Sequence, residues 1–298
     1  MSLLSRVAGK LPGGHGAKAH AGPGAPARGA VLDTPEAREL QERVAAVPFW
    51  FHSLELGMGV VTPGFKSREI HHRELASFQL PDLRGKSVLD VGAWDGFYSF
   101  SAERLGAERV VALDYHVWGL DRDAKNRYKA ECKAKGIPQR HPKHIPELWK
   151  FDELPGKRGF DLARAALGSR VDSVVRDATK MDAATVGQFD VVLYLGVLYH
   201  MENPLESLKR VREVTKEVAV IETEAAAFRG FKDRPMCEFF HPSRQLADDP
   251  TNFWAPNAAA LAGLCEAAGF SRVELLTPAP SPLRVPVARY RLVAHAYV

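Results

Sequence analysis

The chain has 298 residues, of which 46% are hydrophobic and 26% charged, and its formal net charge is +4 at pH 7. This composition is typical of a globular protein with a sizeable core, and a charge this small favours polyanion binding only weakly. Three widely spaced cysteines exclude a disulfide framework and a zinc site, and the lack of a long apolar run or signal sequence excludes membrane insertion and export, so we expect a cytoplasmic protein.

The first 30 residues are rich in Gly, Ala and Pro, and all of their charged residues are basic. Such a segment cannot bury enough apolar surface to order itself, so we expect a flexible tail over 1–30. A transit peptide or an RNA-contacting arm is the alternative. A helix is predicted to begin at Pro35, after the cap candidates Asp33 and Thr34. Residues 31–84 are expected to form a helical cover over a main domain of residues 85–298.

Beyond the cover, strands and helices alternate. Continuous apolar runs predict parallel strands covered on both faces, at residues 86–92, 109–114, 171–178, 189–196 and 217–224. Helices are predicted at 96–106, 203–214 and 256–269, the second with Asn203 as N-cap. Two last strands, at 270–277 and 289–298, suit an antiparallel hairpin at the sheet edge. The prediction is a doubly wound, mostly parallel α/β sheet.

The stretch SVLDVGAWDGFYSF, residues 87–100, marks the turn after the first strand, where such a sheet binds its ligand. Gly92 and Gly96 allow close backbone approach, whereas Trp94 between them argues against a bound pyrophosphate. S-adenosylmethionine, which has no phosphate, fits better. Asp114 at the end of the second strand is placed to accept the ribose hydroxyls, and Asp177 after the third to bind the adenine amino group. Asp90 either holds the turn together or contacts the ligand through water.

The motifs LDVGAWDGF, VVALD, RDA and FDVVLYLGVLYHMENPLESLKRV occur in this order. With them the chain resembles the class I S-adenosylmethionine-dependent methyltransferases, which have a seven-stranded Rossmann-like sheet. More narrowly, HSLELGMGVVTPGF, GVLYH and NFWAPN resemble the wobble-uridine tRNA methyltransferases that complete 5-methoxyuridine or 5-carboxymethoxyuridine. The resemblance covers roughly residues 48–118 and 170–276.

The resemblance implies a set of cofactor-binding residues. Asp90, Gly92, Ala93 and Gly96 would contact the methionine end, Asp114 and Tyr115 the ribose, and Asp177 with Ala178 the adenine. Leu195 and Tyr199 would flank the sulfonium. The chain departs from the tRNA enzymes at Trp94, where a glycine is usual, and at Phe65 and Ile70, which replace the Trp and Lys that hold a carboxylated cofactor. We therefore expect plain methyl transfer rather than carboxymethyl transfer.

An insertion of about residues 119–160 separates the second and third strands. It contains a predicted helix at 122–136, and residues 119–150 carry nine Lys/Arg against four Asp/Glu. A solvated helical face, a lid over the acceptor and a contact for RNA phosphates all remain open.

A hydroxyl acceptor must lose a proton during methylation, and His200 after the fourth strand has a side chain suited to that role. A packed, hydrogen-bonded histidine is the alternative, and Tyr199 is expected to orient cofactor or substrate. Glu222, Glu224 and His71 are candidate acceptor-binding residues. No clustered carboxylates of the kind a metal-dependent methyltransferase needs are seen, so no metal is expected.

Three functions compete. The leading hypothesis is methylation of a hydroxyl on a small molecule such as a sugar or a specialised metabolite. The second is O-methylation of a wobble 5-hydroxyuridine, with tRNA as partner. The third is a catalytically silent nucleotide- or RNA-binding module on the same fold. The oligomeric state is left open.

Overall fold

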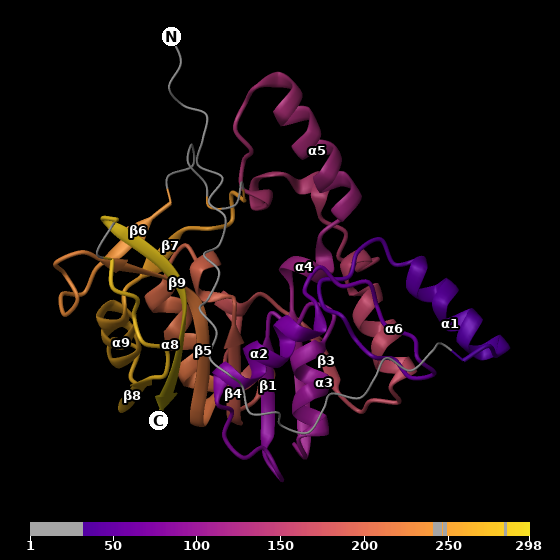
Figure 1. Cartoon of the computed structure of the whole chain (residues 1–298), viewed down its shortest axis with the longest axis horizontal. Helices are drawn as coiled ribbons and strands as arrows, with labels where there is room; N and C mark the ends of the chain where they lie inside the picture. The colour runs from indigo at the N-terminus through magenta and orange to yellow at the C-terminus, as the bar shows by residue number, and fades with distance from the viewer. Residues whose placement is uncertain (1–31, 241–245, 247–248, 283–284) are drawn as a thin grey trace, which may run out of the picture. The chain divides into compact units, whose positions relative to one another are not determined.

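The computed structural model describes residues 32–240, 246, 249–282 and 285–298 (Figure 1). The predicted flexible tail of residues 1–30 therefore lies outside the described residues. The main sheet has seven strands in the order β3-β2-β1-β4-β5-β9-β8. Their bounds are β1 (Ser87–Val91), β2 (Arg109–Asp114), β3 (Asp172–Val175), β4 (Phe189–Leu195), β5 (Thr215–Phe228), β8 (Arg272–Leu275) and β9 (Val287–Tyr297).

Strands β1 to β5 pair in parallel, whereas β9 pairs antiparallel with both β5 and β8. The predicted doubly wound sheet with an antiparallel hairpin at one edge is confirmed. The strand order runs outward from β1 through β2 to β3 on one side and through β4 to β5 on the other. The crevice between β1 and β4, where the order reverses, is where ligands of such sheets bind.

Helices cover both faces of the sheet because successive strand residues point to opposite sides. Val88 packs into one apolar cluster with α1 (Pro35–Ala45), α2 (Arg68–Phe78), α3 (Phe97–Arg104) and α6 (Arg158–Ala166). Leu89 packs into the other with α7 (Ala183–Val186), α8 (Pro204–Val214) and α9 (Ala258–Ala267). Helices α1 and α2 lie within residues 31–84, the segment that is called the cover below.

Capping side chains set the helix starts that the sequence predicts. Thr34 accepts a hydrogen bond from the backbone of Ala37 at the start of α1, and Asn203 accepts one from Glu206 at the start of α8. The last helix begins two residues later than predicted. Pro256 belongs to β7 (Trp254–Pro256), which pairs with β6 (Cys237–Phe239) in a small antiparallel sheet absent from the sequence prediction, and Asn257 caps α9.

The insertion contains α4 (His116–Gly119), α5 (Arg122–Lys135) and three short 3-10 turns, η1 (Pro142–His144), η2 (Pro146–Leu148) and η3 (Pro155–Lys157), before α6. Its two ends meet, because Leu120 forms a β-bridge with Trp149 and the backbone of Asp121 donates to Leu148 at 2.7 Å. Figure 1 shows α5 at the top of the view, above α4. Two further 3-10 turns, η4 (Ala178–Lys180) and η5 (Leu198–His200), follow β3 and β4.

Candidate active site

A cavity of about 950 Å³ lies at the carboxyl ends of β1, β2, β3 and β4. Its wall also includes residues of the N-terminal cover, of the insertion and of the segment that contains Asp249 and Thr251. This is the switch point of the sheet, and the volume is in the range of small-molecule and cofactor sites.

Gly92 lies in the cavity wall, at the turn that follows β1. Its φ is +81°, and a Cβ atom there would come within 2.7 Å of the Val197 side chain. Both the backbone conformation and the close approach of the loop after β4 therefore require glycine.

Asp114 holds the glycine turn in place from the end of β2. Its Oδ2 accepts the backbone N–H of Trp94 at 3.0 Å, and its Oδ1 accepts that of Val117 at 2.9 Å. Burial raises the pKa of Asp114 to about 6. The carboxylate also lines the cavity, so it is placed to accept a ribose hydroxyl.

Trp94 lines the cavity, and its ring packs against the N-terminal cover. Its φ is +52°, and its indole stacks on Phe51 of the cover with ring centroids 4.1 Å apart. Trp94 therefore links the glycine turn to the cover.

The wall next to Asp114 suits an adenosine. Asp177 uses Oδ1 for both of its bonds to Thr179, so its Oδ2 can face an exocyclic amine. The other predicted cofactor residues that line the cavity are Tyr115, Ala178 and Leu195.

Five of the predicted site residues lie outside the cavity wall, each for a packing reason. Asp90 faces α3 and accepts a hydrogen bond from Ser99 at 2.5 Å. This contact ties β1 to α3 across the turn, which is the first of the two roles considered for Asp90. Ala93 is buried, Gly96 leaves no room for a Cβ against Phe100 and Phe160, and Glu224 pairs with Arg291. His71 stacks on Phe97 at 4.1 Å and accepts the backbone N–H of Ser53 at Nε2.

His200 lines the cavity, and its protonation pattern is set by Thr251. Its Nδ1 lies 3.0 Å from both the carbonyl oxygen and Oγ1 of Thr251. Burial lowers the pKa of His200, so the ring is neutral near pH 7. A neutral ring that donates from Nδ1 keeps Nε2 as an acceptor.

Tyr199 and Glu222 also line the cavity, together with Arg291 of β9. The guanidinium of Arg291 forms a two-pronged ion pair with Glu222, with one N–O distance of 2.5 Å, and lies 4.9 Å from the centre of the Tyr199 ring. Although burial works against it, Glu222 raises the pKa of Arg291.

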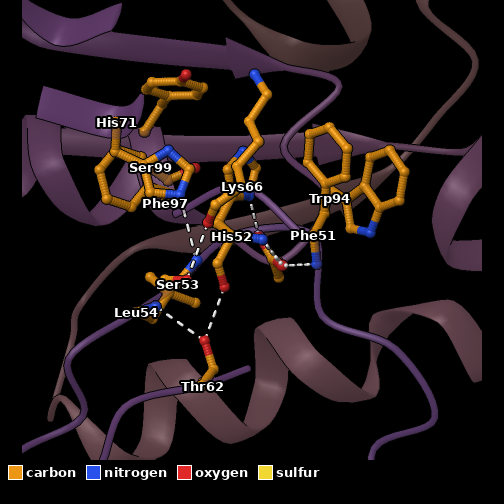
Figure 2. Close-up of polar contacts among 12 residues, drawn as sticks. Phe51, His52, Ser53, Leu54, Thr62, Lys66, His71, Trp94, Phe97 and Ser99 are labelled. Atoms are coloured by element: carbon orange, nitrogen blue, oxygen red, sulfur yellow. Dashed lines mark hydrogen bonds and ion pairs between the residues drawn. The ribbon is translucent and has the colours of Figure 1, made fainter. Parts of the chain in front are cut away.

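Sequence reasoning missed Asp95, which anchors the cover to the glycine turn. Its Oδ2 accepts the backbone N–H groups of Phe51 and His52 at 2.8 and 2.9 Å, and its Oδ1 bonds Nδ1 of His52. Figure 2 shows Phe51 beside Trp94, and His52 between Phe51 and the stacked pair His71 and Phe97. The position of Asp95 between two turn glycines could have indicated a structural role. Its partners could not be predicted, because they lie more than 40 positions away in the sequence.

The charge of the wall suits a cationic cofactor. Among the described residues that line the cavity, eight are Lys or Arg and nine are Asp or Glu. A sulfonium can bind here without an added counter-ion, and the residues present fit S-adenosylmethionine in shape, polarity and charge. Within the described part of the chain, no group of His, Cys, Asp and Glu could hold a metal ion, and no helix is long and apolar enough to cross a membrane.

The sheet order, the edge hairpin and the cavity at the switch point are those of the Rossmann-like, S-adenosylmethionine-dependent methyltransferases. In agreement, the sequence family described as Methyltransferase domain matches residues 67–275, and the chain belongs to this family. S-adenosylmethionine is the cofactor of this class.

Known relatives agree with this assignment. The chain is 24% identical to a tRNA U34 carboxymethyltransferase of Pseudomonas fluorescens over 193 residues, which cover 64% of this chain and 48% of that protein. It is 26% identical to the enzyme of the same name from Chromohalobacter salexigens, covering 68% and 50%. The chain thus spans about half the length of these relatives.

A solved structure shares the fold. The N-terminal domain of EvdMO1, crystallised in the presence of SAH and D-fucose, superposes with a TM-score of 0.57 at 20% identity. The match covers 91% of this chain and all of that domain.

Proposed function

We propose that this chain transfers the methyl group of S-adenosylmethionine to a hydroxyl group of a small molecule. The observation that carries the proposal is the walled cavity at the switch point, where His200 presents an acceptor nitrogen beside the predicted cofactor site. An enzyme of this kind works mainly by positioning the acceptor and excluding water.

The cofactor would be held by the strand tips. Asp114 would accept the ribose hydroxyls, Asp177 the adenine amino group, and the turn at Gly92 would contact the methionine end. When bound, the cofactor supplies a methyl group on a positively charged sulfur that leaves as a neutral thioether.

His200 would act as the general base. When the acceptor oxygen takes up the methyl group that the bound cofactor supplies, Nε2 of His200 would accept the proton of that hydroxyl. Thr251 holds the ring orientation during this transfer. Tyr199, in ring contact with His200 at 4.1 Å, would orient the acceptor.

Transfer of a plain methyl group is favoured over a carboxylated one. A carboxylated cofactor needs a cation near its sulfur, and Arg291, which lies against Tyr199, is already paired with Glu222 and Glu224. Lys66, the cation of the cover that lines the cavity, is paired with Glu74 at 2.6 Å. Phe65, at the position of the expected Trp, is 76% exposed.

Contacts of the insertion favour a small acceptor. Arg122 lies 3.4 Å above the ring of Phe49 in the cover, His141 stacks on Phe253, and Lys143 pairs with Glu202 after β4. The insertion is thereby fastened on both sides of the cavity. A wobble nucleotide still attached to its RNA would require these contacts to open.

O-methylation of a wobble 5-hydroxyuridine in tRNA is the second candidate. The names of the relatives favour it, and so do the exposed basic residues Arg127, Lys133 and Lys135 on α5.

One experiment separates the two candidates. The purified chain is incubated with S-adenosylmethionine and either tRNA carrying wobble 5-hydroxyuridine or a panel of hydroxylated small molecules, and methylated products are identified by mass spectrometry. Small-molecule products alone are expected, and efficient methylation of the tRNA would reverse the preference. Calorimetry that detects no S-adenosylmethionine binding would instead support a silent module.

His200→Gln tests the general base. The variant is expected to lower kcat by roughly 10²- to 10⁴-fold, the usual contribution of a general base, while cofactor affinity stays unchanged. Unchanged kcat would assign His200 a packing role.

A further inference from the structure

We propose that His141 and His200 form a donor–acceptor pair of imidazoles that binds an uncharged, polyhydroxylated acceptor of the sugar type. This inference rests on the proposed function and deepens it, because it names the acceptor class. His141 comes from the insertion and His200 from the turn after β4, and both line the same cavity.

The hydrogen-bonding role of His200 follows from its neighbours. Thr251 Oγ1 donates its single hydrogen to Oδ1 of Asp249 at 2.7 Å. It can therefore only accept from His200, as can the carbonyl oxygen of Thr251. Nδ1 of His200 must carry the hydrogen, and Nε2 is left as an acceptor. Asp249 and Thr251 are thus positioning residues for this ring.

His141 has the opposite arrangement. Its Nδ1 accepts the backbone N–H of Lys143 at 3.1 Å, so the hydrogen of the neutral ring sits on Nε2. The ring of Phe253 stacks on that of His141 with the centroids 5.7 Å apart, and the centroid of His116 lies 6.4 Å away. His141 can therefore offer a donor to a ligand without moving.

Both rings are uncharged near neutral pH. Burial lowers the pKa of His141 to about 4, and it lowers that of the neighbouring His116 to about 3. Lys125 on α5, which also lines the cavity, opposes protonation of His116 and His200 by its own charge. The negative charge of Asp249 raises the pKa of all three histidines, His116, His141 and His200, and so partly offsets these effects.

Four of the cations in the wall are held in ion pairs, and carboxylates outnumber cations among the described lining residues. Lys143 pairs with Glu202 and Lys150 with Asp121, in addition to the pairs of Lys66 and Arg291 given above. With nine carboxylates against eight cations among the described lining residues, a phosphate or carboxylate on the acceptor would meet no net positive field.

A polyhydroxylated acceptor supplies both groups that these two rings require, a hydroxyl that donates and an oxygen that accepts. One hydroxyl donates to Nε2 of His200 and is the one methylated, while the oxygen of the next accepts from Nε2–H of His141. A site built to hydrogen-bond hydroxyls rejects analogues that lack them, because its own polar groups are then left unpaired.

The tautomers can be measured without any acceptor. ¹⁵N-labelled full-length chain, saturated with SAH, is examined by two-bond ¹H–¹⁵N NMR correlation, with His141→Gln and His200→Gln assigning the two rings and exposed His72→Gln as the matched control. We expect His141 to be the Nε2–H tautomer and His200 the Nδ1–H tautomer at pH 7. A charged ring, or the reverse tautomer at either residue, would overturn the proposal.

The acceptor class is tested on the same sample with two matched probes, methyl β-D-glucopyranoside and glucose 6-phosphate. The neutral glucoside at tens of millimolar is expected to shift both imidazole signals, and to do so at lower concentration than the phosphate. Tighter binding of glucose 6-phosphate, or no shift with either probe, would overturn the assignment.

Variants at His141 separate binding from folding. His141→Leu, which has no donor, should raise the Kd of the glucoside about tenfold, whereas His141→Gln, which keeps an N–H near Nε2, should recover most of the affinity. Equal Kd values in both variants and the parent would contradict the role. SAH binding by calorimetry reports separately on the proposed function, since its loss refutes the cofactor site but leaves the tautomers measurable.

Discussion

The carboxylate of Asp114 has two roles. It accepts hydrogen bonds from the glycine turn and from α4, and it is the candidate ligand of the ribose. Asp114→Ala is expected to weaken S-adenosylmethionine binding by about 1–3 kcal/mol, the usual cost when buried hydrogen-bond partners are lost. Calorimetry measures the change, with Asp152→Ala on the exposed surface as control. Affinity equal to that of the parent would refute the ribose assignment.

The raised pKa of Asp114 also predicts a pH dependence. Because burial raises that pKa to about 6, the carboxylate becomes protonated as the pH falls through 6, well above the usual value for Asp. A protonated carboxyl accepts fewer hydrogen bonds, so cofactor affinity should fall below about pH 6. In the Asp114→Asn variant this fall in affinity should be absent. Calorimetry from pH 5 to 8 measures it, and a fall of the same size in the variant would contradict the prediction.

Asp95 is expected to stabilise the fold through the cover. Asp95→Asn keeps the size of the side chain but loses the charge that accepts three hydrogen bonds from Phe51 and His52. Leaving these buried donors poorly satisfied should cost about 1–3 kcal/mol in the free energy of unfolding. Urea denaturation measures the loss, and hydrogen exchange should increase at residues 50–54. An unchanged midpoint would show that Trp94 stacking alone holds the cover.

At the scale of elements, α5 is fastened to the cover through the guanidinium of Arg122. Arg122→Ala removes the cation–π contact with Phe49, which is worth about 0.5–2 kcal/mol. Faster hydrogen exchange in residues 122–135 is expected, with little change in global stability. Arg127→Ala on the exposed side of the same helix is the matched control. Equal exchange in both variants would mean that other contacts hold α5.

Elements with a local signal were predictable from the sequence. Caps such as Asn203, and apolar runs covered on both faces, define α8 and the parallel strands through interactions between near neighbours in the chain. The strands β6 and β7 have three residues each and are separated by a long connection. They are too short to show an alternating pattern, so the sequence does not predict this sheet.

At the scale of the whole molecule, the two ends of the insertion are already in contact, at Leu120 with Trp149 and at Asp121 with Leu148. Replacing residues 122–147 by a short glycine linker should leave the fold and S-adenosylmethionine binding intact, because the residues proposed to bind the cofactor lie on the strand tips. Acceptor methylation should be lost, since His141 and Lys125 leave with the insertion. Calorimetry measures cofactor binding, and a methylation assay measures transfer to the acceptor. Loss of cofactor binding would show that the insertion also shapes the adenosine site.

The candidate site was predictable where it follows strand ends and not where it depends on distant pairing. Gly92, Asp114 and Asp177 stand at consecutive strand tips, and topology alone brings them together. Asp95 with His52, Arg291 with Glu222, and Thr251 with His200 join residues separated by 43, 69 and 51 positions. Their partners become visible only once the chain is folded.

The position of β9 has a consequence for how the protein matures on the ribosome. This strand is synthesised last of the seven, yet it lies between β5 and β8 and brings Arg291 to the cavity. Until residues 287–297 have left the exit tunnel, a nascent chain has an open gap in its sheet and an unpaired Glu222 in its binding wall. Competence to bind the acceptor should therefore arise only after β9 has left the tunnel and has paired with β5 and β8.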